Sequence, residues 1–485
     1  MIGPGSLIDR IDDLLNPIIV RELRQVVRGK FIWSVLILFL VFQCAILSIS
    51  IAGRGMTSRS VGMDTLSFLF SILFFASFLL IPLFNGFKFA REQSEGSDEL
   101  LFITTITPEA IIRGKFAASM IFILMLYSAF SPFMAMTFFL SGVDLPMTFM
   151  TLFIAFILSA VGSMAQICFA TLARDGHSQQ FFRGIAVFVQ ITTFFSISGS
   201  GSDMLRYGAS SYFGSSDPLP VVISIVLGSL ALTYFLYLAS AAVISPAGSN
   251  RMYPVRRGAT IIWLLSLMLA VFWAERHGTG SFLFTWLVAV SSLLVIAVLV
   301  AVSERDFLTE RVAREIPHKR PFRDLAFLMY SGAAGGIAWV IVMMLLTVCV
   351  IAFFPFNTGI SSLRGLSEAM PEFMIFTVYC LAYAMIGSVI RRKLLYNYIE
   401  VRNTWVVALL VCTAFSILPV FLGAFTGFNT ESLMIGNPFM MAANKLEGGF
   451  FAALFFLLAI ILNFRWLSRQ YKAFMRAGNS DDQQL

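Results

Sequence analysis

The sequence predicts an all-α integral membrane protein with about twelve transmembrane helices. Of its 485 residues, 58% are hydrophobic and only 13% are charged, whereas soluble domains are roughly 45–50% apolar and about 25% charged. The apolar residues form continuous runs close to 20 residues long, the length that a helix needs to cross the hydrocarbon core. The runs do not alternate polar and apolar positions, so a transmembrane β-barrel is excluded.

Twelve runs are long enough to cross a bilayer, and each is expected to form one helix. They cover residues 31–52, 66–87, 116–140, 149–172, 182–200, 219–244, 259–274, 281–302, 327–355, 373–390, 404–428 and 449–466. The run at 182–200 is the weakest, because Arg183 stands at its edge and its end is rich in Ser and Gly. The first run follows a polar lead and is longer than a signal-peptide core, so we expect it to be retained.

The spans divide into two groups of six. We expect an amphipathic interfacial segment at 1–30, membrane domains at 31–244 and 245–467, and a polar cytoplasmic tail at 468–485. The longest predicted cytoplasmic loops follow spans 2 and 8, at equivalent places in the two halves. The sequences that precede spans 1 and 7 also show a weak similarity. These likenesses leave open whether the second half is a true repeat.

The basic residues predict the orientation. With the N-terminus in the cytoplasm, 28 of the 34 Lys and Arg residues fall in cytoplasmic segments, as the positive-inside rule requires. An overlooked helix would reverse every later loop and destroy this asymmetry, so the count supports twelve spans and two cytoplasmic termini. The net charge of +7 then faces anionic lipid and a cytoplasmic partner, and a nucleic-acid partner is not expected.

Apart from Arg183 and Arg465, each one residue inside the boundary of its span, the predicted spans contain no Asp, Glu, Lys, Arg or His. Charged groups inside a membrane mark ion and proton pathways, so their absence argues against an ion-driven secondary transporter. The remaining polar side chains are expected to hydrogen-bond between helices, with substrate contact as the alternative; they are Gln43, Gln166, Gln190 and Asn463. The chain has no P-loop, no HExxH and no Cys/His cluster, so we expect no catalytic residues, no metal and no cofactor.

The lead before the first span predicts two short helices on the membrane surface. The first, at residues 6–15, starts with a capping-box pair. The second starts at Pro17, which suits the first turn of a helix. One of its faces carries Ile19, Leu23 and Val26, the other carries Arg21, Arg24 and Arg28, and Glu22 lies between them. A basic amphipathic helix of this kind lies in the membrane interface.

The loop between spans 2 and 3 has its own pattern. A polar turn around Gly96 is followed by a short amphipathic stretch at 99–105. Thr107 and Pro108 then provide a cap and a first-turn proline for a helix that leads directly into span 3.

These two segments together resemble the permease subunits of type-2 ABC exporters. The resemblance lies in Asn-Pro-Ile-Ile-Val-Arg-Glu-Leu-Arg before span 1 and in the Glu, Gly, Glu-Leu-Leu, Thr, Pro and Gly-Lys positions after span 2. It implies a coupling helix that docks on a separate ATPase subunit. The positions that match are Glu92, Gly96, Glu99, Leu100, Leu101, Thr104, Pro108, Gly114 and Lys115. The basic unit of that family has six spans, so the twelve spans here are a departure.

The resemblance implies a permease subunit in the bacterial cytoplasmic (inner) membrane, which moves a substrate with ATP hydrolysed by a partner. An uncharged interior with many of the 51 Phe residues favours a hydrophobic substrate. The alternative is a membrane scaffold or assembly factor without transport activity. One chain could complete a pathway, or two could associate as a homodimer or heterodimer.

The loop at 303–326 lacks the pattern of the first cytoplasmic loop. It starts with a capping-box pair, Ser303 and Asp306, and is expected to continue as a charged helix to Pro317. It is either a solvated helix or a degenerate second docking element.

Overall fold

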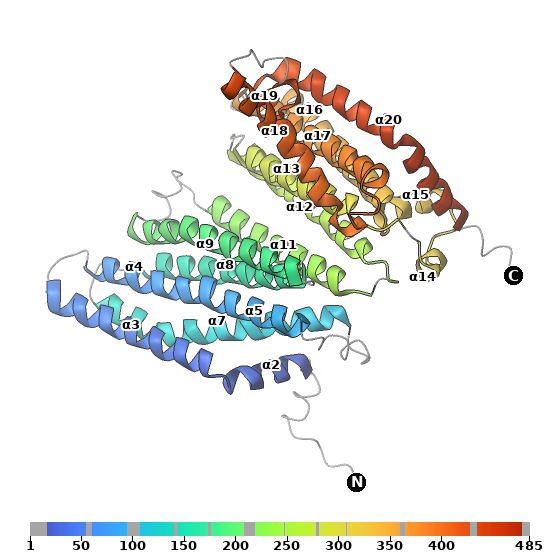
Figure 1. Cartoon of the computed structure of the whole chain (residues 1–485). Helices are drawn as coiled ribbons and strands as arrows, with labels where there is room; N and C mark the ends of the chain where they lie inside the picture. Colours follow the sequence, from blue (N-terminus) through green and yellow to red (C-terminus); the bar gives the residue numbers. More distant parts are fainter. Residues whose placement is uncertain are drawn as a thin grey trace, which may run out of the picture. The chain divides into compact units, whose positions relative to one another are not determined.

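The computed structural model describes residues 17–54, 61–94, 107–139, 144–172, 176–207, 219–246, 248–277, 281–306, 308–358, 364–426 and 434–477. Regular structure in these ranges is helical, without strands. Within them, twelve helical stretches are long and apolar enough to cross a membrane. The prediction of an all-α, multi-pass membrane protein is therefore confirmed (Figure 1).

The chain folds as two compact units, Met1–Ser245 and Pro246–Leu485. Six of the candidate spans lie in each unit. The division follows Ser245, one residue after the position at which the sequence pattern separates the two groups of six.

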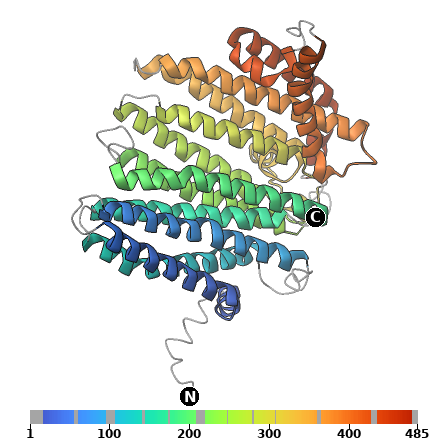
Figure 2. The same cartoon turned by 60° about the vertical axis from the view of Figure 1, so that its left-hand side comes forward.

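Unit 1 is a bundle in which α8 contacts α5, α7, α9 and α11. Its second span is one continuous helical stretch made of α4, the π-helical turn η1 and α5. The elements in order are α2 (Pro17–Val27), α3 (Lys30–Arg54), α4 (Val61–Phe74), η1 (Phe75–Leu80), α5 (Ile81–Ser94), α7 (Pro108–Phe139), α8 (Leu145–Leu172), α9 (Gly176–Tyr207) and α11 (Leu219–Ile244). Figure 2 shows these long helices running side by side, with α2 at the end of α3.

The π turn gives unit 1 a polar contact inside its core. A π turn leaves backbone carbonyls without their usual α-helical partners, and here the carbonyl of Phe78 accepts a hydrogen bond from Gln190 of α9. Gln190 in turn accepts one from Gln166 of α8, at 3.2 Å. Ser77, in the same turn, lies 3.2 Å from the hydroxyl of Ser159. The turn is thus held by side chains of two neighbouring helices.

All four polar residues singled out within the spans bond across helices. Gln43 donates to the Leu69 carbonyl at 3.1 Å and Asn463 to that of Met385 at 3.1 Å, while Gln166 and Gln190 take part in the π-turn contacts. The prediction of helix–helix hydrogen bonding is confirmed.

Unit 2 is built around α17, which contacts α13, α18 and α20. Its elements are α12 (Met252–His277), α13 (Ser281–Val302), α14 (Glu310–Arg314), α15 (Arg320–Met329), α16 (Ala333–Thr358), α17 (Arg364–Lys393), η3 (Val401–Asn403), α18 (Thr404–Thr426), η4 (Met434–Gly436), α19 (Pro438–Ala443) and α20 (Lys445–Ala477). Helix α20 continues through most of the predicted polar tail, and residues 478–485 lie outside the described part of the chain.

Two local predictions in unit 2 are wrong. The capping box at Ser303 and Asp306 does not form: the Ser303 hydroxyl accepts from the Trp405 amide, and Asp306 accepts from the Trp466 indole. The charged helix is correspondingly short, only α14. The predicted start of span 9 at residue 327 is also wrong, because α15 ends at Met329 and α16 begins after Gly332, whose φ of +154° ends the helical path.

Contacts within each unit pair segments that were predicted to share a side of the membrane. In unit 1, Arg206 lies 3.7 Å from Asp64, and both belong to predicted outer segments. In unit 2, Tyr471 donates to Asp324 at 2.8 Å, and both belong to predicted cytoplasmic segments. These two contacts agree with the predicted topology, in which successive helices cross the membrane in opposite directions. The distribution of Lys and Arg predicts which side is cytoplasmic.

A matched pair of glycines tests the packing of α19 on α20. A Cβ atom at Gly448 would lie 1.9 Å from the Met441 carbonyl oxygen, whereas one at Gly449 would meet nothing within 4 Å. Backbone atoms cannot move aside cheaply, so we expect Gly448→Ala to destabilise unit 2 by about 2 kcal/mol. The measurement is the midpoint of thermal unfolding in detergent. Gly449→Ala is the control, and equal midpoints for the two variants would contradict the packing.

The orientation can be tested with two single cysteines in a variant whose five native cysteines are replaced. We expect Arg206→Cys to react with a membrane-impermeant maleimide added to intact cells, because residue 206 lies in a predicted outer segment. Arg24→Cys should react only after permeabilisation. Labelling of Arg24→Cys alone in intact cells would reverse the topology.

Candidate functional site

Helix α2 places one acidic side chain against the bundle. The helix begins at Pro17, as predicted, and packs on α7 and α3. Arg21, Arg24 and Arg28 are exposed, while Leu23 packs against the core. Glu22 points inward and is only 5% exposed. The three arginines of the predicted basic face are therefore exposed, and the carboxylate beside them is buried.

The last turns of α5 and the first turns of α7 supply the partners of Glu22. These turns flank residues 95–106, which lie outside the described part of the chain. Lys88 and Glu92 are one turn apart on α5. Helix α7 starts at Pro108, as predicted, with the Thr107 hydroxyl accepting from the Ala110 amide at 3.3 Å. Lys115 lies two turns into α7.

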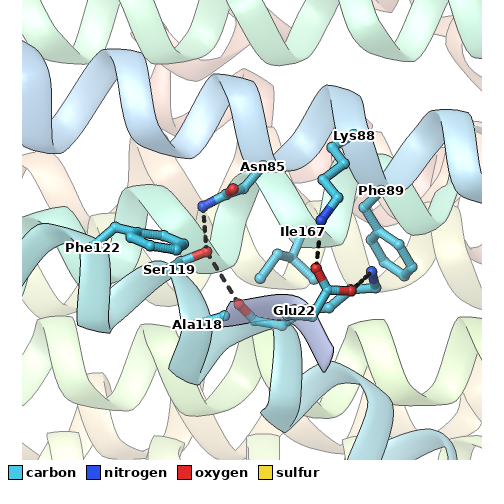
Figure 3. Close-up of a pocket in the computed structure, with 9 residues that line it drawn as sticks. Glu22, Asn85, Lys88, Phe89, Ala118, Ser119, Phe122 and Ile167 are labelled. Carbon is cyan, nitrogen blue, oxygen red and sulfur yellow. Dashed lines mark hydrogen bonds and ion pairs between the residues drawn. The ribbon is translucent and has the colours of Figure 1, made fainter. Parts of the chain in front are cut away.

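The four charged side chains form a closed ring of alternating charges, called the ion ring below. Glu22 contacts Lys88 at 2.7 Å and Lys115 at 2.8 Å. Glu92 contacts Lys115 at 2.6 Å and Lys88 at 3.7 Å. The ring thus joins three helices, α2, α5 and α7. Figure 3 shows the ammonium group of Lys88 directed at the carboxylate of Glu22.

The ion ring is largely removed from water. The side chains of Glu22 and Lys115 are 7% and 10% exposed. Burial raises the pKa of Glu22, but the charges of Lys115 and Lys88 and their hydrogen bonds outweigh it, so that its pKa lies below the ordinary value. Glu22 is therefore ionised at neutral pH, and both lysines keep a full counter-charge. A buried ion pair is costly to break, because the remaining partner is left unpaired.

The space beneath the ring is too small for a substrate. A pocket of about 20 Å³ has room for a single water molecule. Asn85 donates to the Ser119 hydroxyl at 2.8 Å, and Ser119 donates to the Lys115 carbonyl at 3.2 Å (Figure 3). The Lys115 ammonium packs against the ring of Phe89 and lies 4.5 Å from the ring centroid. The site is thus a set of polar contacts that joins three helices, with only a small cavity beside it.

The structure brings together residues that the sequence placed in two separate groups. Glu22 came from the predicted interfacial helix, and Glu92 and Lys115 from the predicted docking loop. Gly114 is buried in the first turns of α7. The other loop positions, Gly96, Glu99, Leu100, Leu101 and Thr104, lie outside the described residues.

Sequence reasoning missed Lys88, the residue that closes the ring. A signal was present, since Lys88 stands four residues before Glu92 at the end of a span. Charges at that spacing share a helix face.

Unit 2 contains a second buried charge cluster, with the signs reversed. Arg256, near the start of α12, pairs with Glu304, which follows α13. It also donates to the carbonyl of Leu328 in the last turn of α15 and to those of Tyr330 and Gly332 in the break before α16. Glu304 accepts from the Gly332 amide at 2.7 Å. Gly336 allows this approach, since a Cβ atom there would lie 2.6 Å from the Arg256 guanidinium.

The chain matches no protein-family model and no curated protein. Among the described residues, no group of three or more His, Cys, Asp or Glu side chains could hold a metal ion.

The substitution Glu22→Gln tests the ion ring. It leaves two partly buried lysines with one carboxylate, so we expect the opening of α2 to become easier by about 2 kcal/mol. Hydrogen exchange of the α2 amides in detergent measures this opening. Glu109→Gln, at an exposed position in the first turn of α7, is the control. Unchanged exchange in Glu22→Gln would show that the ring does not hold α2.

Proposed function

We propose that this chain is the permease subunit of an ABC-type transporter. In this proposal a separate ATPase subunit docks on the loop between spans 2 and 3 and supplies the energy. The observation that supports it most is the ion ring, because it ties the amphipathic helix to both ends of the segment that the resemblance assigns to docking. A loop that only connected two spans would not need to be held at both ends by buried ion pairs.

The ion ring suits a mechanism in which α7 acts as a lever. Helix α7 has 32 residues, about 48 Å at 1.5 Å per residue, and it runs from the docking segment through the membrane. A push on its first turn would be carried along the helix. Because Lys115 is bonded to α2 and α5 through Glu22 and Glu92, these three elements would move together rather than bend apart.

The interior of unit 1 suits an uncharged substrate. The π turn brings Ser77 and the Phe78 carbonyl against hydrogen-bonding side chains of α8 and α9. Phenylalanine rings surround this turn, with Phe74 stacked on Phe78 and Phe194 at 4.9 and 5.7 Å between centroids. Such mild polarity among aromatic groups favours a hydrophobic or lipid-like substrate over an ion.

The test is an affinity pull-down of the detergent-solubilised protein from its native membrane, with partners identified by mass spectrometry. Wild type is compared with the double variant Glu99→Lys, Leu101→Asp. The matched control is Glu310→Lys, Leu325→Asp, which makes the same changes at exposed positions of unit 2. We expect an ATP-binding subunit with wild type and control but not with the docking variant.

Other outcomes are equally informative. Loss of the ATPase only in the unit 2 variant would move the docking site to the segment after α13. If folded wild type brings down no ATPase, the transporter proposal loses its energy source and a membrane scaffold becomes the better explanation.

A further inference from the structure

The end of α20 carries a line of cations on one face, called the basic stripe below. Its members are Arg465, Arg469, Lys472 and Arg476. Spacings of four, three and four residues place them above one another on a helix. All four are exposed. The stripe therefore presents a continuous cationic edge about 16 Å long, at 1.5 Å per residue.

The stripe continues an apolar face of the same helix. Leu454, Leu458 and Ile461 precede Arg465 at the same spacings and are 52%, 46% and 70% exposed. In a membrane-spanning helix, exposed Leu and Ile side chains face lipid tails. One face of α20 thus changes from apolar to cationic without turning away from the lipid.

The change occurs where the helix should leave the hydrocarbon. The apolar stretch of α20 starts at Leu446, and about 20 residues cross the hydrocarbon core, which ends the crossing close to Arg465. Trp466 stands beside it, and tryptophan is enriched at the membrane interface. The first cations of the stripe are therefore at the depth of the lipid headgroups.

The described residues of unit 2 provide no counter-charges for the stripe. Within the described part of the chain, none of the four cations has an ion-pair or hydrogen-bond partner, and α20 has no acidic residue after Glu447. The opposite face is occupied, since Phe474 packs against Phe327 and Tyr330. Figure 1 shows the end of α20 beside α15. The stripe faces away from these contacts and is open to an anionic partner.

We propose that the basic stripe binds the headgroups of anionic phospholipids. Side chains of a helix lean toward its N-terminus, which here is the direction of the membrane. Arg469 and Lys472 can thus reach back to phosphates while their aliphatic parts cover apolar surface. The continuity with the lipid-facing residues favours lipid over a protein partner. This inference goes beyond the proposed function and does not depend on an ATPase.

The experiment measures lipid selectivity by electron paramagnetic resonance. The full chain is reconstituted in phosphatidylcholine vesicles with traces of spin-labelled phosphatidylglycerol or spin-labelled phosphatidylcholine, and the motionally restricted fraction of each is compared. We expect wild type to select phosphatidylglycerol, with a selectivity that falls as salt is raised. Neutralising the stripe with R465Q, R469Q, K472Q and R476Q should reduce this selectivity by about twofold or more.

A matched control removes the same charge elsewhere in unit 2. The variant R305Q, R311Q, R314Q and K319Q changes four exposed cations that lie outside α20, and it should keep most of the selectivity. The charge-conserving variant R465K, R469K and R476K should keep it as well. If the fourfold stripe variant does not fold, R469Q with K472Q replaces it.

Two results would overturn the proposal. One is a stripe variant that selects phosphatidylglycerol as well as wild type does; if that variant also loses a protein in the pull-down from native membranes, the stripe is assigned to that protein. The other is a control variant that loses as much selectivity as the stripe variant.

Discussion

A polar group inside a bilayer has no water to bond, and this requirement shapes both units. Backbone groups satisfy it through long helices, which is why the described ranges contain helices and turns alone. Side chains satisfy it by bonding the next helix, as Gln43 and Asn463 do at 3.1 Å. Full charges are kept to the helix ends, where Glu22 and Lys115 meet. The fold and the location of the charged site follow from the same constraint.

In both units a buried charged side chain at or before the start of the first span bonds to groups near the second and third spans. In unit 1 the charge is Glu22, and its partners are lysines at the end of the second span and the start of the third. In unit 2 it is Arg256, and its partners are Glu304 after the second span and carbonyls just before the third. The positions correspond, but the signs are opposite. The two units thus use different chemistry at comparable places along their chains.

The sequence was sufficient for the features that depend on length and periodicity. The twelve spans, the start of α2 at Pro17 and the start of α7 at Pro108 were all predictable, because apolar runs and first-turn prolines act locally. The ion ring was not, since Lys88 and Glu22 are 66 residues apart and only the fold brings them together. The capping box at Ser303 failed for the same reason: Trp405, 102 residues away, uses the hydroxyl that the local pattern assigned to a helix start.

The π turn in the second span has a consequence for how this chain tolerates insertions and deletions. A π turn contains one residue more than an α turn does. The extra residue lies between Phe75 and Leu80, and the side chains of α5 keep the directions that they would have in a continuous α-helix. Deleting one residue there would restore ordinary α geometry and leave Lys88 and Glu92 directed at α2. The same deletion elsewhere in the span would rotate them by about 100° and separate them from Glu22. Evolutionary changes of length in this span should therefore be found at the π turn.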